Sequence, residues 1–265
     1  MPATRRPEPR ARNPIRTRSR LLAAGVKLFA ARGFHGVAVD EIVATARCNK
    51  RMLYHYFGDK EGLYVEVLQT VYARMEAAEM APLPRGGTTE QAIRAVIARH
   101  FEFLADNPDF VKLLLWENLN EGRLLAKHPG LLSKAPIIER LREILERGRE
   151  RGELTGDGDV QHLLVLMMGM CFIYFSNRHT LRQAVGLDAD RPHVRSRGLR
   201  MAQNAFLAAI GMRKGRRQVT GTSMPCRVAR PRRKTAVREM AIAVPFGLDA
   251  ARSRKCQAAS YPRST

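Results

Sequence analysis

The sequence predicts an all-α fold, and three observations support this. Apolar side chains recur at helical spacing through most of residues 15–212. Residues that cap helices well stand at the starts of these segments, and Gly or Pro often marks their ends. No segment before residue 213 alternates apolar and polar side chains as a strand would. The hydrophobic content of 45% is enough for a core, and 265 residues allow one large domain or two small ones.

Four helices are expected in the first 80 residues. Gly33 is well placed to end the first helix in the left-handed conformation. Arg47 and Cys48 form a turn between the second and third helices, and Asn49 is a good N-cap for the third. Asp59 caps the fourth helix. The expected helices cover residues 15–32, 38–46, 50–57 and 60–80.

Five further helices are expected before residue 212. Pro108, Pro136 and Pro192 stand at first helical positions, where proline is favoured. A loop with Gly and Pro covers residues 122–130. The apolar run 163–175 is too short to span a bilayer, so we expect it to be a buried core helix. The expected helices cover residues 88–105, 108–120, 136–151, 160–177 and 192–211.

The positive charge of the chain is concentrated at its two ends. The net charge is +21, of which residues 1–20 carry +6 and residues 213–265 carry +12. Residues 1–14 are expected to be a disordered basic arm, and residues 213–265 a disordered basic tail. Such an arm beside a DNA-binding helix would contact phosphates, whereas the simpler interpretation is a solvated tail.

Several classes of site and location are disfavoured by the sequence. The four cysteines lack the spacing of metal ligands, so no metal site is expected. Glycine-rich nucleotide-binding motifs and the Gly-x-Ser-x-Gly motif are missing, so neither a cofactor nor an enzyme is predicted. No secretory signal or membrane segment is recognised, and the cysteine pattern suits a reducing compartment, so we expect a cytoplasmic protein without a membrane partner.

The segment 39–64 is the most informative part of the chain. Two short helices joined by a tight turn precede a third helix, and the second short helix begins with Lys50 and Arg51 and ends in aromatic residues. This arrangement can place a helix in the DNA major groove and anchor its flanks on phosphates. Lys50 or Arg51 can read guanine, although each could equally be a solvated charge.

Residues 17–64 resemble the DNA-binding domain of the TetR family of repressors. The resemblance is carried by Leu28-Phe29 with Gly33-Phe34, Val39-x-x-Ile42-Val43-x-x-Ala46, Leu53-Tyr54-His55-Tyr56-Phe57 and Lys60-Glu61-x-Leu63-Tyr64. The region from Pro108 to Arg123 also looks like the regulatory domain of one TetR subgroup. Two positions depart from the family pattern: Arg47 stands where Gly is usual, and Val39 where Thr is frequent.

The resemblance implies two domains: an N-terminal three-helix helix-turn-helix DNA-binding domain, residues 15–75 with the motif at 38–57, and a C-terminal helical ligand-binding and dimerisation domain, residues 76–212. It further implies a transcriptional repressor that binds double-stranded DNA at a palindromic operator and is released by a small-molecule effector. The alternative is nonspecific nucleic-acid binding by the basic ends. The candidate DNA contacts are Lys50, Arg51, Met52, Tyr54, His55, Tyr56 and Lys60.

The last two long helices and the middle of the chain are the expected sites of dimerisation and ligand binding. The helices at 160–177 and 192–211 carry apolar faces that suit a subunit interface or an ordinary buried core pair. The resemblance implies that two copies of this helix pair form a four-helix bundle in a homodimer. Each candidate effector contact could instead be a core residue. These candidates are His100, Phe103, Trp116, Glu117, Asn120 and Met167.

Overall fold

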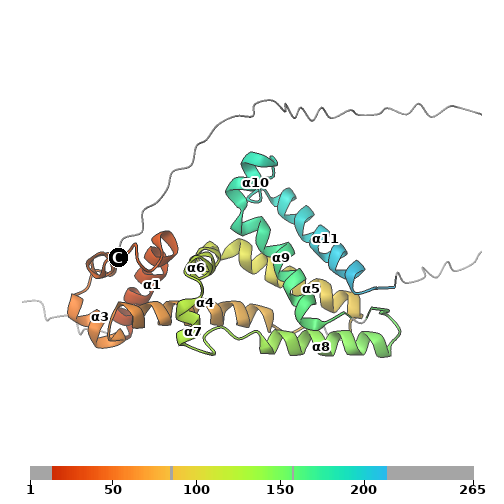
Figure 1. Ribbon diagram of the computed structural model, residues 1–265, viewed down its shortest axis with the longest axis horizontal. Coiled ribbons are helices and arrows are strands. Elements are labelled where there is room, and N and C mark those ends of the chain that lie inside the picture. Colours follow the sequence, from red (N-terminus) through yellow and green to blue (C-terminus); the bar gives the residue numbers. More distant parts are fainter. Residues whose placement is uncertain (1–13, 84–85, 157, 214–265) are drawn as a thin grey trace, which may run out of the picture. The chain divides into compact units, whose positions relative to one another are not determined.

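The structure, a computed structural model, describes residues 14–83, 86–156 and 158–213. These residues form eleven α-helices and no β-strand, so the predicted all-α fold is confirmed (Figure 1). The helices are α1 (Pro14–Arg32), α2 (Val39–Ala46), α3 (Lys50–Phe57), α4 (Lys60–Glu79), α5 (Thr89–Asp106), α6 (Pro108–Leu119), α7 (Arg123–Lys127), α8 (Ala135–Glu150), α9 (Val160–Ser176), α10 (Arg178–Ala184) and α11 (Pro192–Ala209).

The first three helices pack on one another, and α1 and α3 also pack on α4. Leu21 and Phe29 of α1, Ile42 of α2 and Leu53 of α3 are fully buried between them. Tyr64 of α4 closes this core, with its ring edge-on to Phe29 at a centroid distance of 4.9 Å. A helix as short as α3 gains little stability from its own hydrogen bonds, so this packing determines its position.

The packed side chains of α1, α2, α3 and the start of α4 are called the helix-turn-helix core below. Helix α4 continues from this core into the C-terminal helices, where it packs against α5 and α6. Helix α6 also packs on α1. Here the indole of Trp116 covers Gly33, and a Cβ at residue 33 would lie 2.8 Å from the ring. Because Gly33 also has a φ of +69°, glycine is required there for two separate reasons.

The C-terminal part is built around α5, which packs against α8, α9 and α11. Helices α9 and α11 lie side by side (Figure 1). The buried side chains of this core include Ile97, Phe101, Leu141, Met167 and Phe206. In the described residues, no single helix has the length and apolarity needed to cross a membrane; α9 and α10 together meet those two criteria but are bent by 73°.

Two short helices were not predicted. Helix α7 occupies part of the expected loop at 122–130, after Gly122 adopts a φ of +63°. Helix α10 starts directly after α9, with Asn177 ending one helix and preceding the other. Neither helix buries a residue, so their sequences carry no apolar periodicity that could reveal them. The predictions for residues 1–13 and 214–265 lie outside the described residues, whereas Pro14 belongs to α1.

Candidate nucleic-acid interface

The turn between α2 and α3 is formed by a residue in the left-handed conformation. Arg47 has φ 49° and ψ 52°, the conformation for which glycine is usual. Its backbone N–H donates to the carbonyl of Ala44 at 3.0 Å. The guanidinium of Arg20, from α1, donates to the carbonyls of Ala46 and of Arg47, the latter at 2.6 Å. Arg20 therefore satisfies carbonyls at the end of α2 and ties the turn to α1.

Helix α3 begins with the predicted cap. The side chain of Asn49 accepts a hydrogen bond from the backbone N–H of Arg51 at 2.8 Å. Leu53 and Phe57 are buried, as their spacing of four residues requires on one helix face. The cap and these two anchors leave the opposite face of α3 in solvent.

That opposite face carries the candidate base-reading side chains. Arg51, Tyr54 and His55 are exposed, and Tyr54 retains 45% of its accessible surface. Lys50 forms an ion pair with Asp40 of α2 at 2.9 Å, and this hydrogen bond raises the pKa of Lys50. The lysine therefore stays charged, but it would have to leave Asp40 before it could contact a base.

The remaining candidates lie at the edge of this face. Met52 and Tyr56 are half-buried and pack against the hydrophobic core. The Nζ of Lys60 lies 4.4 Å from the ring centroid of Phe34, a cation–π contact, and partial burial lowers the pKa of this lysine. The structure thus places all seven candidates on α3 or directly after it, and Lys50, Arg51, Tyr54 and His55 are the exposed ones.

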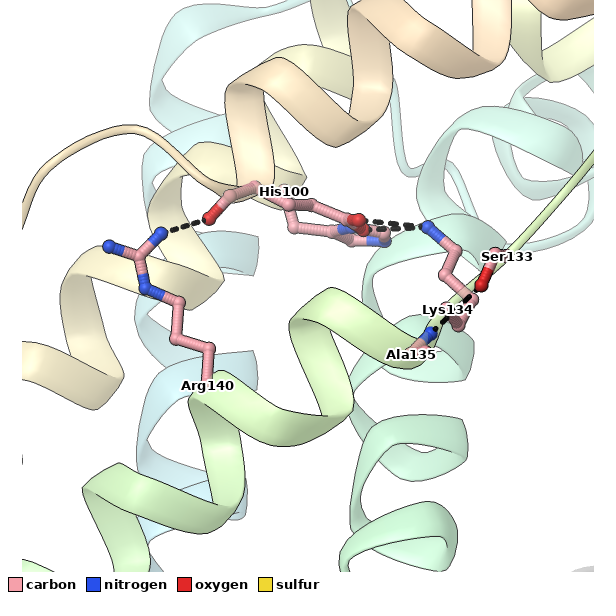
Figure 2. Close-up of polar contacts among 6 residues, drawn as sticks. His100, Ser133, Lys134, Ala135 and Arg140 are labelled. Carbon is pink, nitrogen blue, oxygen red and sulfur yellow. Dashed lines mark hydrogen bonds and ion pairs between the residues drawn. The ribbon is translucent and has the colours of Figure 1, made fainter.

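The C-terminal end of α4 is held by a polar cluster, defined here as Glu79 and His100, which are buried, and Lys134, Arg140 and Arg99, which are half-buried. The carboxylate of Glu79, which is 2% exposed, contacts His100 Nδ1 at 3.1 Å and Lys134 Nζ at 2.9 Å. Arg140 donates to the carbonyls of Glu79 and Ala81, and Arg99 also donates to that of Ala81. Figure 2 shows how the side chains of His100, Lys134 and Arg140 lie in this cluster. Burial would raise the pKa of Glu79, but the contacts with His100 and Lys134 outweigh it and hold the pKa below its usual value.

The six candidate ligand residues do not converge on one site. His100 belongs to the Glu79 cluster, and Met167 is buried in the core. Phe103 packs edge-on against Phe110 at a centroid distance of 5.3 Å. Trp116 covers Gly33. Glu117 and Asn120 share a pocket, which lies between the helix-turn-helix core and helices α6 and α7.

Among the described residues, no group of three or more His, Cys, Asp or Glu side chains is arranged to hold a metal ion. Cys171 is buried, which raises the pKa of its thiol to about 12 and keeps it protonated.

Comparison with known proteins agrees with this geometry. Residues 21–67 match the family model described as "Bacterial regulatory proteins, tetR family", and residues 90–205 match "Tetracyclin repressor-like, C-terminal domain". The chain is 35% identical over 186 residues to the HTH-type transcriptional repressor NicS of Pseudomonas putida, an alignment that covers 70% of this chain and 88% of NicS. The chain belongs to the TetR family.

Other relatives support the same assignment. The HTH-type transcriptional repressor SCO4008 of Streptomyces coelicolor is 31% identical over 160 residues, which cover 60% of this chain and 79% of that protein. A TetR-like transcriptional regulator from Rhodococcus sp. RHA1 has a similar fold, with a TM-score of 0.54, 20% identity and coverage of 74% and 96% of the two chains. This TetR-family chain is accordingly a DNA-binding transcriptional regulator.

Sequence reasoning missed two kinds of residue in this TetR-family protein. Arg20 orients the turn, but it lies 26 residues from the carbonyl of Ala46. Phe34 and Tyr64 line the pocket at Glu117, although the sequence suggested only that they belong to the family motif. No local pattern reveals such pairs, because their partners are brought together by packing.

The left-handed Arg47 gives a stability prediction. Arg47→Gly is expected to raise the free energy of unfolding by about 0.5–1 kcal/mol, because glycine adopts positive φ without steric cost. Urea unfolding followed by circular dichroism measures the change. Arg47→Ala removes the same charge but keeps the unfavourable φ, so an equal gain in both variants would contradict the backbone explanation.

Proposed function

We propose that this chain is a ligand-responsive repressor that binds a palindromic operator as a homodimer and is released by a small-molecule effector. Residues 15–75 would bind DNA, and residues 76–212 would bind the effector and the second subunit. The observation that carries the proposal is the exposed face of α3, where Arg51, Tyr54 and His55 stand free of the core that anchors Leu53 and Phe57. The candidate contacts remain Lys50, Arg51, Met52, Tyr54, His55, Tyr56 and Lys60.

Exposed apolar side chains on α9 and α11 support the homodimer. Val165 and Ile173 retain 67% and 44% of their accessible surface, and Gly169 lies between them at the same four-residue spacing. Met201 of α11 is 60% exposed. Paired copies would bury this face as a four-helix bundle. A dimer also gives two α3 helices, which can read half-sites one helical turn of DNA or a multiple apart.

A charge on this face should separate the subunits. Val165→Glu is expected to raise the dimer dissociation constant at least about tenfold, because a symmetric interface would bury two unpaired carboxylates. Val185→Glu is a matched control, since Val185 is 64% exposed but lies after α10. Analytical ultracentrifugation over a range of concentrations measures both. Identical dissociation constants for the two variants would place the interface elsewhere.

The direct test of the proposed function is selection of binding sites from a random DNA library by the full chain. An enriched palindrome is expected. The alternative function, nonspecific binding driven by the basic ends, predicts no enrichment and a steep loss of affinity with salt that is the same for every sequence. That result would overturn the proposal.

A further inference from the structure

Glu117 carries a buried oxygen that has no hydrogen-bond partner in the described part of the chain. The residue is 2% exposed, and its Oε1 accepts a hydrogen bond from the Tyr64 hydroxyl at 2.7 Å. Its Oε2 has no partner, and neither has the buried hydroxyl of Tyr72. Removing a carboxylate oxygen from water without a donor is costly, so this site favours any molecule that brings one.

Glu117 lines the pocket between the helix-turn-helix core and helices α6 and α7. Its volume is about 340 Å³, which suits a small molecule. Phe34 and Tyr64 form one wall, from the loop after α1 and from α4. Asn120 and Leu124, after α6 and in α7, form another part of the wall. An occupant would therefore touch the DNA-binding part and the C-terminal part at once.

The other carboxylates of the pocket have partners. Glu61 is paired with Lys127 at 3.1 Å, and Glu121 with Arg123 at 2.9 Å. Both pairs are on the exposed rim. Each brings two opposite charges together, so its charges largely cancel. Glu117 is the carboxylate of this pocket that lacks a cationic partner among the described residues, which gives the interior a preference for positive charge.

We propose that this pocket binds a small organic cation, with an N–H group that donates to Glu117 Oε2 and an apolar part that lies against Phe34 and Leu124. The inference rests on the effector response proposed above and specifies its site and ligand class. A cation satisfies the charge and the hydrogen-bonding need of Glu117 together. Because the occupant touches both walls, its binding changes how the helix-turn-helix core sits against α6, and DNA and ligand oppose each other reciprocally.

Calorimetry on the full chain tests the ligand class. Benzylamine, which is protonated at neutral pH, is compared with benzyl alcohol, a neutral molecule of nearly the same size, and with benzoate. Benzylamine is expected to bind with a dissociation constant below about 10 mM, and the other two at least about tenfold more weakly. Equal affinities for benzylamine and benzyl alcohol, or no saturable binding of benzylamine, would overturn the proposal.

Two variants locate the site. Glu117→Gln keeps the size and the acceptor for Tyr64 but removes the charge, and should weaken benzylamine binding at least about tenfold. Glu76→Gln, an exposed change on α4, should leave affinity within about twofold. Unchanged binding in Glu117→Gln contradicts the proposal. If thermal unfolding shows that Glu117→Gln does not fold, the comparison of the three ligands on the unaltered chain decides.

Operator binding measured with and without benzylamine separates this inference from the proposed function. Specific binding at Glu117 with unchanged operator affinity supports the site and contradicts the effector response. Sequence-specific operator binding without any benzylamine binding leaves the regulator proposal standing and contradicts the cation site. Trp116, the single tryptophan, is adjacent to Glu117 and provides a fluorescence signal for occupation of the pocket.

Discussion

Replacing Arg51 by alanine is expected to lower operator affinity by about 30-fold to 10⁴-fold. Arg51 is exposed at the start of α3, where it can donate two hydrogen bonds to guanine. One such contact discriminates by about 1–3 kcal/mol, and a dimer loses two of them. Fluorescence anisotropy with the selected operator, at one fixed salt concentration, measures the loss.

Two further variants separate base reading from charge. Arg51→Lys retains the charge but not the planar pair of donors, so most of the loss should remain. Arg142→Ala removes an equal charge from α8 and should change affinity by less than about twofold. An Arg51→Lys variant with full affinity would show that Arg51 contacts phosphate and carries no sequence information.

Replacing Lys134 by methionine is expected to lower the free energy of unfolding by about 3 kcal/mol. The ammonium of Lys134 contacts both carboxylate oxygens of Glu79 at 2.9 Å, and Glu79 is buried. Methionine keeps most of the side-chain volume but leaves the buried charge with His100 as its remaining side-chain contact. Urea unfolding at neutral pH measures the effect, and Lys112→Met, an exposed change on α6, should alter stability by less than about 0.5 kcal/mol.

The pH dependence provides a second readout. The folded pKa of Glu79 is held below its unfolded value, so its stabilising contribution is present above the unfolded pKa and is lost as pH falls through the folded pKa. Without Lys134 the pKa of Glu79 should rise, and protonation would then relieve the unpaired charge. The difference in the free energy of unfolding between the unaltered chain and Lys134→Met should therefore become smaller as the pH falls from 7 toward about 5. If this difference in the free energy of unfolding does not depend on pH, the variant is destabilised by lost packing and not by the unpaired charge.

Local features of this fold could be predicted from the sequence. Gly33, Asn49 and Asp59 act through neighbours within a few residues, and each has the predicted conformation or cap. Arg47 departs from the glycine that is usual at this turn of the TetR family, and the neighbouring residues make that departure visible in the sequence. In the structure Arg47 has a positive φ. These positions are determined by backbone geometry, which a short sequence window contains.

Long-range polar pairs could not be predicted in the same way. Tyr64 meets Glu117 across 53 residues, and Glu79 meets Lys134 across 55. Helical periodicity identifies the buried face of each helix but not the helix that faces it. His100 and Glu117 were both predicted as ligand contacts, but they lie in different clusters. The sequence could not show this, because it does not tell which helix each of them faces.

The contacts of α6 with the N-terminal helices limit how this regulator can be recombined with its relatives. Trp116 fits over Gly33, and Glu117 accepts the hydrogen bond of Tyr64. A chimaera joined after α4 would take the two members of each pair from different parents. Exchange of DNA specificity between relatives should therefore succeed when Trp116 and Glu117 of α6 are transferred together with α1 to α4, or when only the exposed face of α3 is replaced.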